Sequence, residues 1–286
     1  MQKYLITGVN GQLGSDLREL AKNSSDQFLF TDVDDLDITD TEAVRDAFRL
    51  FGPDVLINCA SYTAVDKAES DSAAAYLING DAPGILADVC NSFSTLLIHI
   101  STDYVFDGKS NIPYKETDAV NPSGVYAKSK LQGENAVIST SEKAAIFRTS
   151  WLYSSFGLNF VKTILRLGKE RTELNVVFDQ TGSPTYARDL AAAILNAAPV
   201  LMSRKLEGTE IYNYSNEGVA SWYDFAMEIK NIVGFSANIN PIETFEYPTP
   251  APRPVYSVLN KRKVKTEFGF TIPHWKDSLK KALKLC

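Results

Sequence analysis

Two short motifs carry side chains that could together protonate a carbonyl group. Tyr126 and Lys130 are four residues apart, and Thr102 stands upstream in the run Ser-Thr-Asp-Tyr. On a helix, positions i and i+4 share one face, so the lysine would lie beside the phenol. A phenol has a pKa near 10, and a neighbouring cation favours its ionised form. The pair therefore predicts an acid–base group, with the Thr102 hydroxyl holding the substrate oxygen.

Each motif also has a purely structural interpretation. A Tyr-x-x-x-Lys pair occurs by chance and usually lies on a helix surface, and the segment 101–103 could simply cap a turn. A glycine pattern earlier in the chain favours the chemical interpretation over chance.

That pattern is Gly8-x-x-Gly11-x-x-Gly14, which follows the apolar residues 4–6 and precedes an amphipathic stretch. Glycines between a strand and a helix allow the backbone to approach a pyrophosphate, which then sits at the helix N-terminus. The alternative is a glycine turn needed only for packing the helix on the sheet. The position between strand and helix favours a dinucleotide site.

The acidic residue that follows the second strand bears on the choice of cofactor. Asp32 lies eighteen residues beyond Gly14, where a carboxylate can accept hydrogen bonds from a ribose, and this favours NAD. Arg18 could still meet a 2′-phosphate, so both NADH and NADPH remain candidates. We interpret Asp35 and Asp40 as a solvated acidic loop.

The elements needed to position these groups are visible in the hydrophobic pattern. Apolar runs near residues 4–6, 28–30, 55–57, 95–101 and 145–148 alternate with helical patterns at 14–23, 41–51 and 71–91 and from 125 onward. This alternation predicts an α/β fold, a Rossmann-like doubly wound parallel sheet with a smaller C-terminal substrate-binding lobe. We expect an NAD(P)-binding domain over 1–150, with returning elements near 186–215, and a substrate lobe over 151–185 and 216–286.

Composition narrows the class of protein further. The chain has 286 residues, a net charge of −6 and three cysteines. The negative charge argues against nucleic acid as a partner, and the apolar runs are too short to span a membrane. We expect no catalytic metal, since hydride transfer with a tyrosine acid needs none. With few cysteines and no leader pattern, we expect a cytoplasmic protein.

Taken in order, these motifs resemble those of the extended short-chain dehydrogenases/reductases. Four further blocks sharpen the resemblance, at residues 58–69 (NCASYTAVDKAE), 148–151 (RTSW), 179–185 (DQTGSPT) and 250–257 (PAPRPVYS). Together they are similar to the dTDP-4-dehydrorhamnose reductase family. That family reduces the 4-keto group of dTDP-4-dehydro-L-rhamnose with NADPH or NADH, giving dTDP-L-rhamnose for cell-surface polysaccharide.

The resemblance implies roles for individual residues. The implied catalytic residues are Thr102, Tyr126 and Lys130. The implied cofactor-binding residues are Gly8, Gly11, Gln12, Leu13, Gly14, Asp32, Asp37, Ile38, Ser61, Tyr62, Thr63, Tyr126 and Lys130. The implied substrate contacts are Thr102, Asp103, Tyr104, Trp151, whose ring would pack on the deoxysugar, and Arg253. Arg253 could equally be a structural ion-pair partner.

Two other functions are compatible with the same motifs. A nucleotide-sugar epimerase or dehydratase would recycle a tightly held NAD, and Asp103 offers the additional acid that such a reaction needs. A relative of this fold also serves as a non-catalytic regulatory subunit of methionine adenosyltransferase, although the intact site argues against it. Rossmann-like enzymes are often dimers, so a homodimer is left open.

Overall fold

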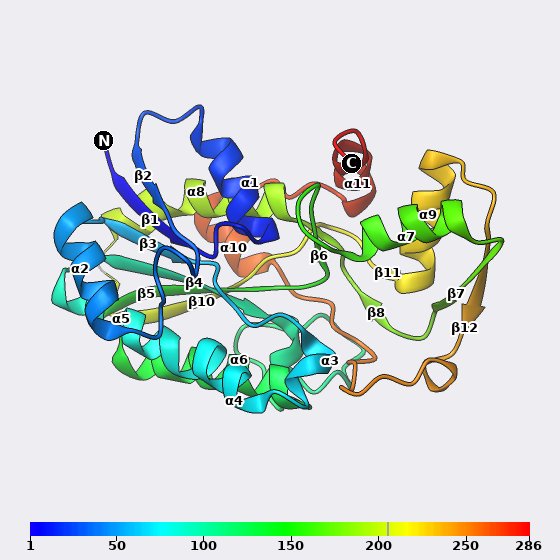
Figure 1. The fold of residues 1–286 in the computed structure, drawn as a ribbon, viewed down its shortest axis with the longest axis horizontal. Helices are drawn as coiled ribbons and strands as arrows, with labels where there is room; N and C mark the ends of the chain where they lie inside the picture. Colours follow the sequence, from blue (N-terminus) through cyan, green and yellow to red (C-terminus); the bar gives the residue numbers. More distant parts are fainter. Residues whose placement is uncertain (205) are drawn as a thin grey trace.

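The computed structural model describes residues 1–204 and 206–286. Figure 1 shows a layered α/β body at one end of the molecule and a smaller group of helices and short strands at the other.

A parallel sheet forms the centre of the larger body. Its strands are β1 (Lys3–Thr7), β2 (Gln27–Phe30), β3 (Val55–Asn58), β4 (Leu96–Thr102), β5 (Lys143–Thr149) and β10 (Gly208–Asn213). Within the described residues they lie in the order β10-β5-β4-β3-β1-β2, and every neighbouring pair is parallel. Strand β2 lies on one side of β1, and β3, which comes next in the chain, lies on the other side. The strand order therefore reverses at β1, which is where sheets of this kind bind ligands.

Helices cover both faces of the sheet because its strands are apolar on both faces. One face carries α1 (Gln12–Ala21), α8 (Ala187–Ser203) and α10 (Arg262–Phe268). The other carries α2 (Thr41–Phe51), α5 (Ala82–Ser92) and α6 (Val125–Thr140), as Figure 1 shows. Short helices α3 (Val65–Ala68) and α4 (Ser72–Tyr76) lie near the start of α6, and a π-helical turn, η1 (Leu77–Asp81), joins α4 to α5.

The smaller group of elements has a hydrophobic core of its own. Its helices are α7 (Phe160–Glu170), α9 (Trp222–Val233) and α11 (Trp275–Leu283). Its strands pair as β6 (Leu152–Tyr153) with β9 (Thr185–Tyr186), β7 (Glu173–Val177) with β12 (Asn238–Ile242), and β8 (Thr181–Gly182) with β11 (Ala220–Ser221). Buried aromatic side chains, including Tyr153, Phe225 and Trp275, fill the space between them.

The predicted fold class is confirmed, since a parallel sheet lies between two helical layers. The helical pattern over 71–91 is present but is divided by the π turn. Helix α10 packs on α8 and β10. This part of the C-terminal segment therefore belongs to the hydrophobic core of the larger body, on the face of the sheet that α1 and α8 cover. Where the protein divides into domains remains a prediction.

Candidate active site

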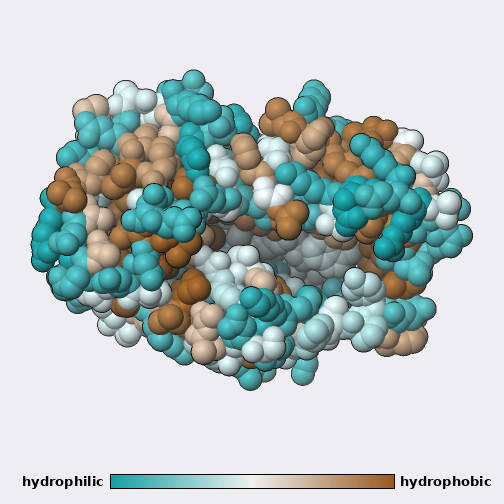
Figure 2. All heavy atoms as spheres, in the orientation of Figure 1, coloured by the Kyte–Doolittle hydropathy of each residue, from teal (hydrophilic) through white to brown (hydrophobic). Residues whose placement is uncertain are grey.

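A cleft opens at the carboxyl ends of β1, β3 and β4. It has a volume of about 930 Å³, and its wall also includes residues 149–152 and 157–158. Figure 2 shows the surface hollowed in the middle of the molecule, with hydrophobic side chains along parts of the rim. The cleft thus lies where the reversal of strand order predicts a ligand site.

Most of the residues singled out from the sequence line this cleft. They are Gly8, Gly11, Gln12, Leu13, Gly14, Asp32, Asp37, Ile38, Ser61, Thr63, Thr102, Asp103, Tyr104, Tyr126, Lys130 and Trp151. Tyr62 and Arg253 are not part of the lining. The hydroxyl of Tyr62 donates to Asp71 (3.0 Å).

The three candidate catalytic side chains come from two elements. Tyr126 and Lys130 come from the first turns of α6, and Thr102 ends β4. The Lys130 ammonium is buried and donates to the carbonyl oxygen of Ile100 (2.7 Å). The Thr102 hydroxyl donates to Asp103 (3.1 Å) and lies close enough to the Tyr126 phenol to hydrogen-bond with it. The three side chains therefore meet at the end of one strand.

Burial controls the proton affinities of this group. Burial raises the pKa of Tyr126 to about 12, with a smaller opposing effect from the Thr102 hydroxyl. Burial also lowers the pKa of Lys130 to about 8 and raises that of Asp103 to about 7. A lower phenol pKa, produced by the Lys130 cation together with a positively charged nicotinamide, remains a prediction. Desolvation is the largest cause of the raised pKa of Tyr126, and the Lys130 ammonium is directed at the backbone carbonyl of Ile100.

The glycine turn has the geometry of a phosphate loop. Gly8 has a positive φ of +67°, and a Cβ there would lie 2.5 Å from the backbone nitrogen of Ala60. The backbone of the turn therefore packs directly on the loop after β3. Helix α1 begins after Gly11, which supplies no side-chain cap, so its first N–H groups remain available to an anion.

Acidic and basic groups meet at the end of β2. Asp32 accepts from the amide of Asn10 (2.7 Å), and the guanidinium of Arg18 donates to the side-chain oxygen of the same Asn10 (3.2 Å). Asp32 could accept hydrogen bonds from a ribose, and Arg18 could bind a 2′-phosphate. Both residues contact Asn10. Asp40, interpreted as part of a solvated loop, instead caps α2 by accepting from the amides of Glu42 and Ala43.

Asn79 is a buried site-supporting residue that the sequence analysis missed. Its side-chain oxygen accepts from the Ser61 hydroxyl and the Tyr62 amide (both 2.8 Å), and its nitrogen donates to Ser129 Oγ on α6 (3.1 Å). It therefore ties the loop after β3 to the helix that carries Tyr126. A lone asparagine in a helical pattern gives no signal of this role, because all of its partners are distant in sequence.

Trp151 and Arg253 differ in their placement. Trp151 is on the cleft wall, and its indole stacks on that of Trp222, with ring centroids 3.6 Å apart. Arg253 pairs with Asp66 (2.8 Å) and lies near enough to Tyr104 for its charge to favour the ionised phenol. Of the two interpretations of Arg253, the ion pair is the contact present here.

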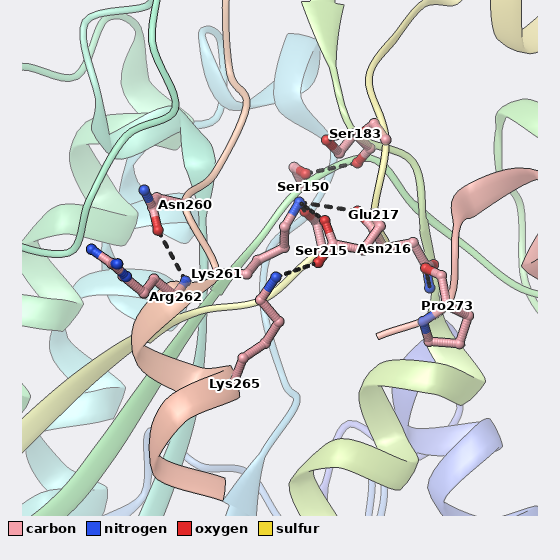
Figure 3. Close-up of polar contacts among 11 residues, drawn as sticks. Ser150, Ser183, Ser215, Asn216, Glu217, Asn260, Lys261, Arg262, Lys265 and Pro273 are labelled. Carbon is pink, nitrogen blue, oxygen red and sulfur yellow. Dashed lines mark hydrogen bonds and ion pairs between the residues drawn. The ribbon is translucent and has the colours of Figure 1, made fainter. Parts of the chain in front are cut away.

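A second, shallower cavity of about 570 Å³ lies beside the start of α10. Figure 3 shows the ammonium groups of Lys261 and Lys265 directed at Glu217, at 3.3 and 2.8 Å. Lys261 also donates to the carbonyl oxygen of Asn216 (3.3 Å). Because these lysines are paired within the chain, the cluster acts as a clamp between α10 and the segment after β10.

Over 1–204 and 206–286, no group of three or more His, Cys, Asp or Glu side chains is placed to hold a metal ion. Within the same residues, no helix is both long and apolar enough to cross a membrane.

The parallel sheet, the glycine turn and the Tyr-Lys pair at the end of β4 define a class, the Rossmann-like proteins of the extended short-chain dehydrogenase/reductase type. A UDP-glucose 4-epimerase from Brucella ovis has the same fold, with a TM-score of 0.84 at 17% identity. The model of the RmlD substrate binding domain family matches residues 2–286. The chain therefore belongs to this family, and the resemblance seen in the motifs is confirmed.

Full-length relatives within the family are about 40% identical to this chain. The chain is similar to a dTDP-4-dehydrorhamnose reductase from Aggregatibacter actinomycetemcomitans, with 40% identity over 98% of each chain. A solved structure of a dTDP-4-dehydrorhamnose reductase from Clostridium acetobutylicum has 44% identity and a TM-score of 0.94 over 99% of each chain. The enzyme from Bacillus anthracis, solved in complex with NADP, has 38% identity and a TM-score of 0.93, covering 100% of this chain and 99% of that one.

Proposed function

We propose that this protein reduces the 4-keto group of dTDP-4-dehydro-L-rhamnose to dTDP-L-rhamnose with NADPH or NADH. The observation that carries the proposal is the meeting of Tyr126, Thr102 and Lys130 in the cleft that also holds the glycine turn. The names of its full-length relatives support the substrate, and the NADP complex of one relative supports the cofactor.

The residues present fit a dinucleotide cofactor. The uncapped start of α1 suits the pyrophosphate, and Asp32 with Arg18 suits the adenosine ribose with or without its phosphate. Asp37 and Ile38 would lie beside the adenine of the cofactor, and Ser61 and Thr63 would lie beside the middle part of the cofactor. When bound, the cofactor supplies the hydride.

Tyr126 is the proposed proton donor to the oxygen at C4 of the sugar. Reduction requires a phenol that still carries its proton, and a pKa raised to about 12 ensures this across the neutral range. The Thr102 hydroxyl would hold the same oxygen, and the Lys130 cation would stabilise the phenolate left behind. Proton donation by Tyr126 and positioning of the sugar oxygen by Thr102 would together supply the proton that the reduction requires.

The sugar and nucleotide would lie between the two hydrophobic cores. Asp103 and Tyr104 would contact the sugar from the end of β4, and Trp151 would offer it an apolar face. We place Arg253 at the nucleotide diphosphate, which would compete with Asp66 for the guanidinium.

We infer that residues 1–150 and 186–215 bind the cofactor and that 151–185 and 216–286 form the substrate lobe. The free thiols of Cys59, Cys90 and Cys286 support a cytoplasmic location.

A recycling enzyme is the second candidate, because Asp103 provides an additional acid. It is buried, and its raised pKa of about 7 leaves much of it protonated at neutrality. An epimerase or dehydratase would return its cofactor unchanged, whereas a reductase consumes one NAD(P)H for each sugar. Cofactor consumption therefore separates the two candidates.

The role of Tyr126 is tested by the substitution Tyr126→Phe. We expect kcat to fall by roughly 10²- to 10⁴-fold, since only the proton donor is lost. The dissociation constant for NADPH, measured by fluorescence titration, should be nearly unchanged. Tyr212→Phe, on the far edge strand β10, is the matched control and should keep wild-type turnover. An equal loss of cofactor affinity in Tyr126→Phe would count against the proposed role.

A further inference from the structure

The stacked pair of Trp151 and Trp222 is a feature that the proposed reaction does not by itself explain. The two ring planes are within 5° of parallel, with centroids 3.6 Å apart. Trp151 lines the cleft, whereas Trp222 is the first residue of α9 and belongs to the second core. Phe160 packs against Trp222 with ring centroids 4.7 Å apart. A wall of the cleft is thus backed by an aromatic stack from the other half of the molecule.

The backbone of Trp151 is in an unfavourable conformation that neighbouring contacts must maintain. Its φ of +46° lies in the left-handed region, which a bulky side chain rarely adopts. Its carbonyl accepts from the Thr185 amide (3.1 Å), which holds the main chain. Its indole abuts Gly182, where a Cβ would lie 2.5 Å from Trp151 Cε2. The ring is therefore confined by Gly182 and Trp222.

Trp222 is itself firmly fixed. Its indole N–H donates to the side-chain oxygen of Gln180 (3.2 Å), and Gln180 in turn donates to the hydroxyl of Thr244 (3.1 Å). The preceding Ser221 forms a reciprocal capping box with Asp224, which sets the start of α9. Trp222 is therefore a rigid support, anchored at its edge as well as at its faces.

We propose that Trp222 is a positioning residue for the nucleotide sugar, which holds the indole of Trp151 as a preformed surface for an apolar face of the hexose. The inference rests on the proposed function for its substrate class. A preformed aromatic surface binds a sugar without the cost of ordering the ring on each encounter. Loss of the support should therefore weaken sugar binding and leave NADPH binding unaffected.

Two substitutions at position 222 separate ring stacking from simple volume. Trp222→Phe keeps a flat ring, whereas Trp222→Leu keeps only apolar bulk. By calorimetry with dTDP-L-rhamnose, we expect the dissociation constant of Trp222→Leu to rise about three- to tenfold and that of Trp222→Phe to stay close to wild type. In turnover assays, the KM for the nucleotide sugar should rise in Trp222→Leu, while the KM for NADPH stays constant.

Tyr223→Leu is the matched control, since it is the next residue of α9 and packs on the same core. It should leave sugar affinity unchanged, so that a general loosening of α9 is distinguished from loss of the stack. The exciton couplet of the stacked indoles in circular dichroism should be present in the wild type and absent from both Trp222 variants. This readout needs no substrate.

Unchanged sugar affinity in Trp222→Leu, with the couplet lost, would overturn the proposal. So would an equal weakening by Tyr223→Leu, or a matching loss of NADPH affinity. Failure of the proposed function is a separate result, seen as absence of NAD(P)H oxidation by the wild type. In that event the calorimetric comparison still decides whether Trp222 supports a sugar site.

Discussion

Burial keeps the Tyr126 phenol protonated at neutral pH and shifts the pKa values of the two ionisable groups near it. The phenol keeps its proton at neutrality, the carboxyl of Asp103 is half protonated near pH 7, and Lys130, with a pKa of about 8, is largely charged at pH 7. Ionised Asp103 raises the pKa of Tyr126 further, because its charge opposes formation of the phenolate. Ionisation of Asp103 should therefore make the tyrosine a weaker donor.

This argument predicts the pH dependence of reduction. In the wild type, kcat/KM for the nucleotide sugar should fall as pH rises through about 7, as Asp103 loses its proton. In Asp103→Asn the fall should move toward about 8, where Lys130 loses its charge. Rates measured from pH 6 to 9 check the shift, with the half-buried Asp118→Asn as control. Identical profiles for Asp103→Asn and the wild type would refute the proposed coupling.

At this scale, sequence predicted the residues with strong local signals and missed those with distant partners. Tyr126, Lys130 and the glycine turn were singled out by their spacing together with the family resemblance, and the structure places them in one cleft. The contacts of Asn79 and Trp222 depend on which segments the fold brings together, so no local pattern reveals them. Burial, which has the largest effect on the pKa of Tyr126, is a property of the tertiary structure and has no local signal in the sequence.

Among the elements, the contact between α6 and the π turn η1 fixes the position of the helix that carries Tyr126 and Lys130. Gly133 faces the turn so closely that an added Cβ would lie 2.0 Å from the carbonyl oxygen of Asn79. The absence of a side chain there allows Asn79 to reach Ser129 on α6. The close approach thus connects the loop after β3 with the helix that holds Tyr126.

Gly133→Ala should separate these two elements. We expect the free energy of unfolding to fall by about 1–3 kcal/mol from overpacking, together with a loss of turnover. Urea denaturation and kcat measurements check both effects. Gly80→Ala is the control, because its Cβ would first meet the end of the Gln132 side chain, which can move aside. Equal stability of the Gly133→Ala and Gly80→Ala variants would show that the close approach of Gly133 to Asn79 does not determine the stability of the protein.

The elements themselves were largely predictable, because strands and helices alternate with clear hydrophobic periods. Over residues 71–91 the pattern predicted one helix, whereas the structure inserts a π turn between α4 and α5. That insertion accommodates the approach of α6, a tertiary effect without a local signal. The short strands after Trp151 were also missed, since pairs of two residues carry no periodicity.

Viewed as a whole, the molecule has two cores that meet along the cleft, and a buried carboxylate lies at their junction. Asp16, on α1, accepts from the hydroxyl of Ser154 (2.6 Å), which follows β6. Asp16 is fully buried, and this burial raises its pKa from 3.8 to about 6. At neutral pH the folded protein therefore carries a poorly solvated charge where the cores join.

This charge makes stability depend on pH with a definite sign. Between about pH 4 and 6 the folded state binds the Asp16 proton more tightly than the unfolded chain, so this residue's contribution to stability falls as pH rises. Asp16→Asn should remove that fall and stabilise the protein at pH 7.5 by on the order of 2 kcal/mol. Denaturation at pH 4.5 and 7.5 measures the difference, and a variant no more stable than wild type at pH 7.5 would contradict it.

The most direct test of the proposed function follows NADPH and NADH absorbance as purified protein acts on dTDP-4-dehydro-L-rhamnose, with Tyr126→Phe in parallel. We predict oxidation of one cofactor molecule per sugar, formation of dTDP-L-rhamnose, and loss of both in the variant. The ratio of the two cofactor rates would also show whether Asp32 or Arg18 dominates at the ribose. Cofactor binding without net oxidation would contradict the account and indicate a recycling enzyme or a non-catalytic protein.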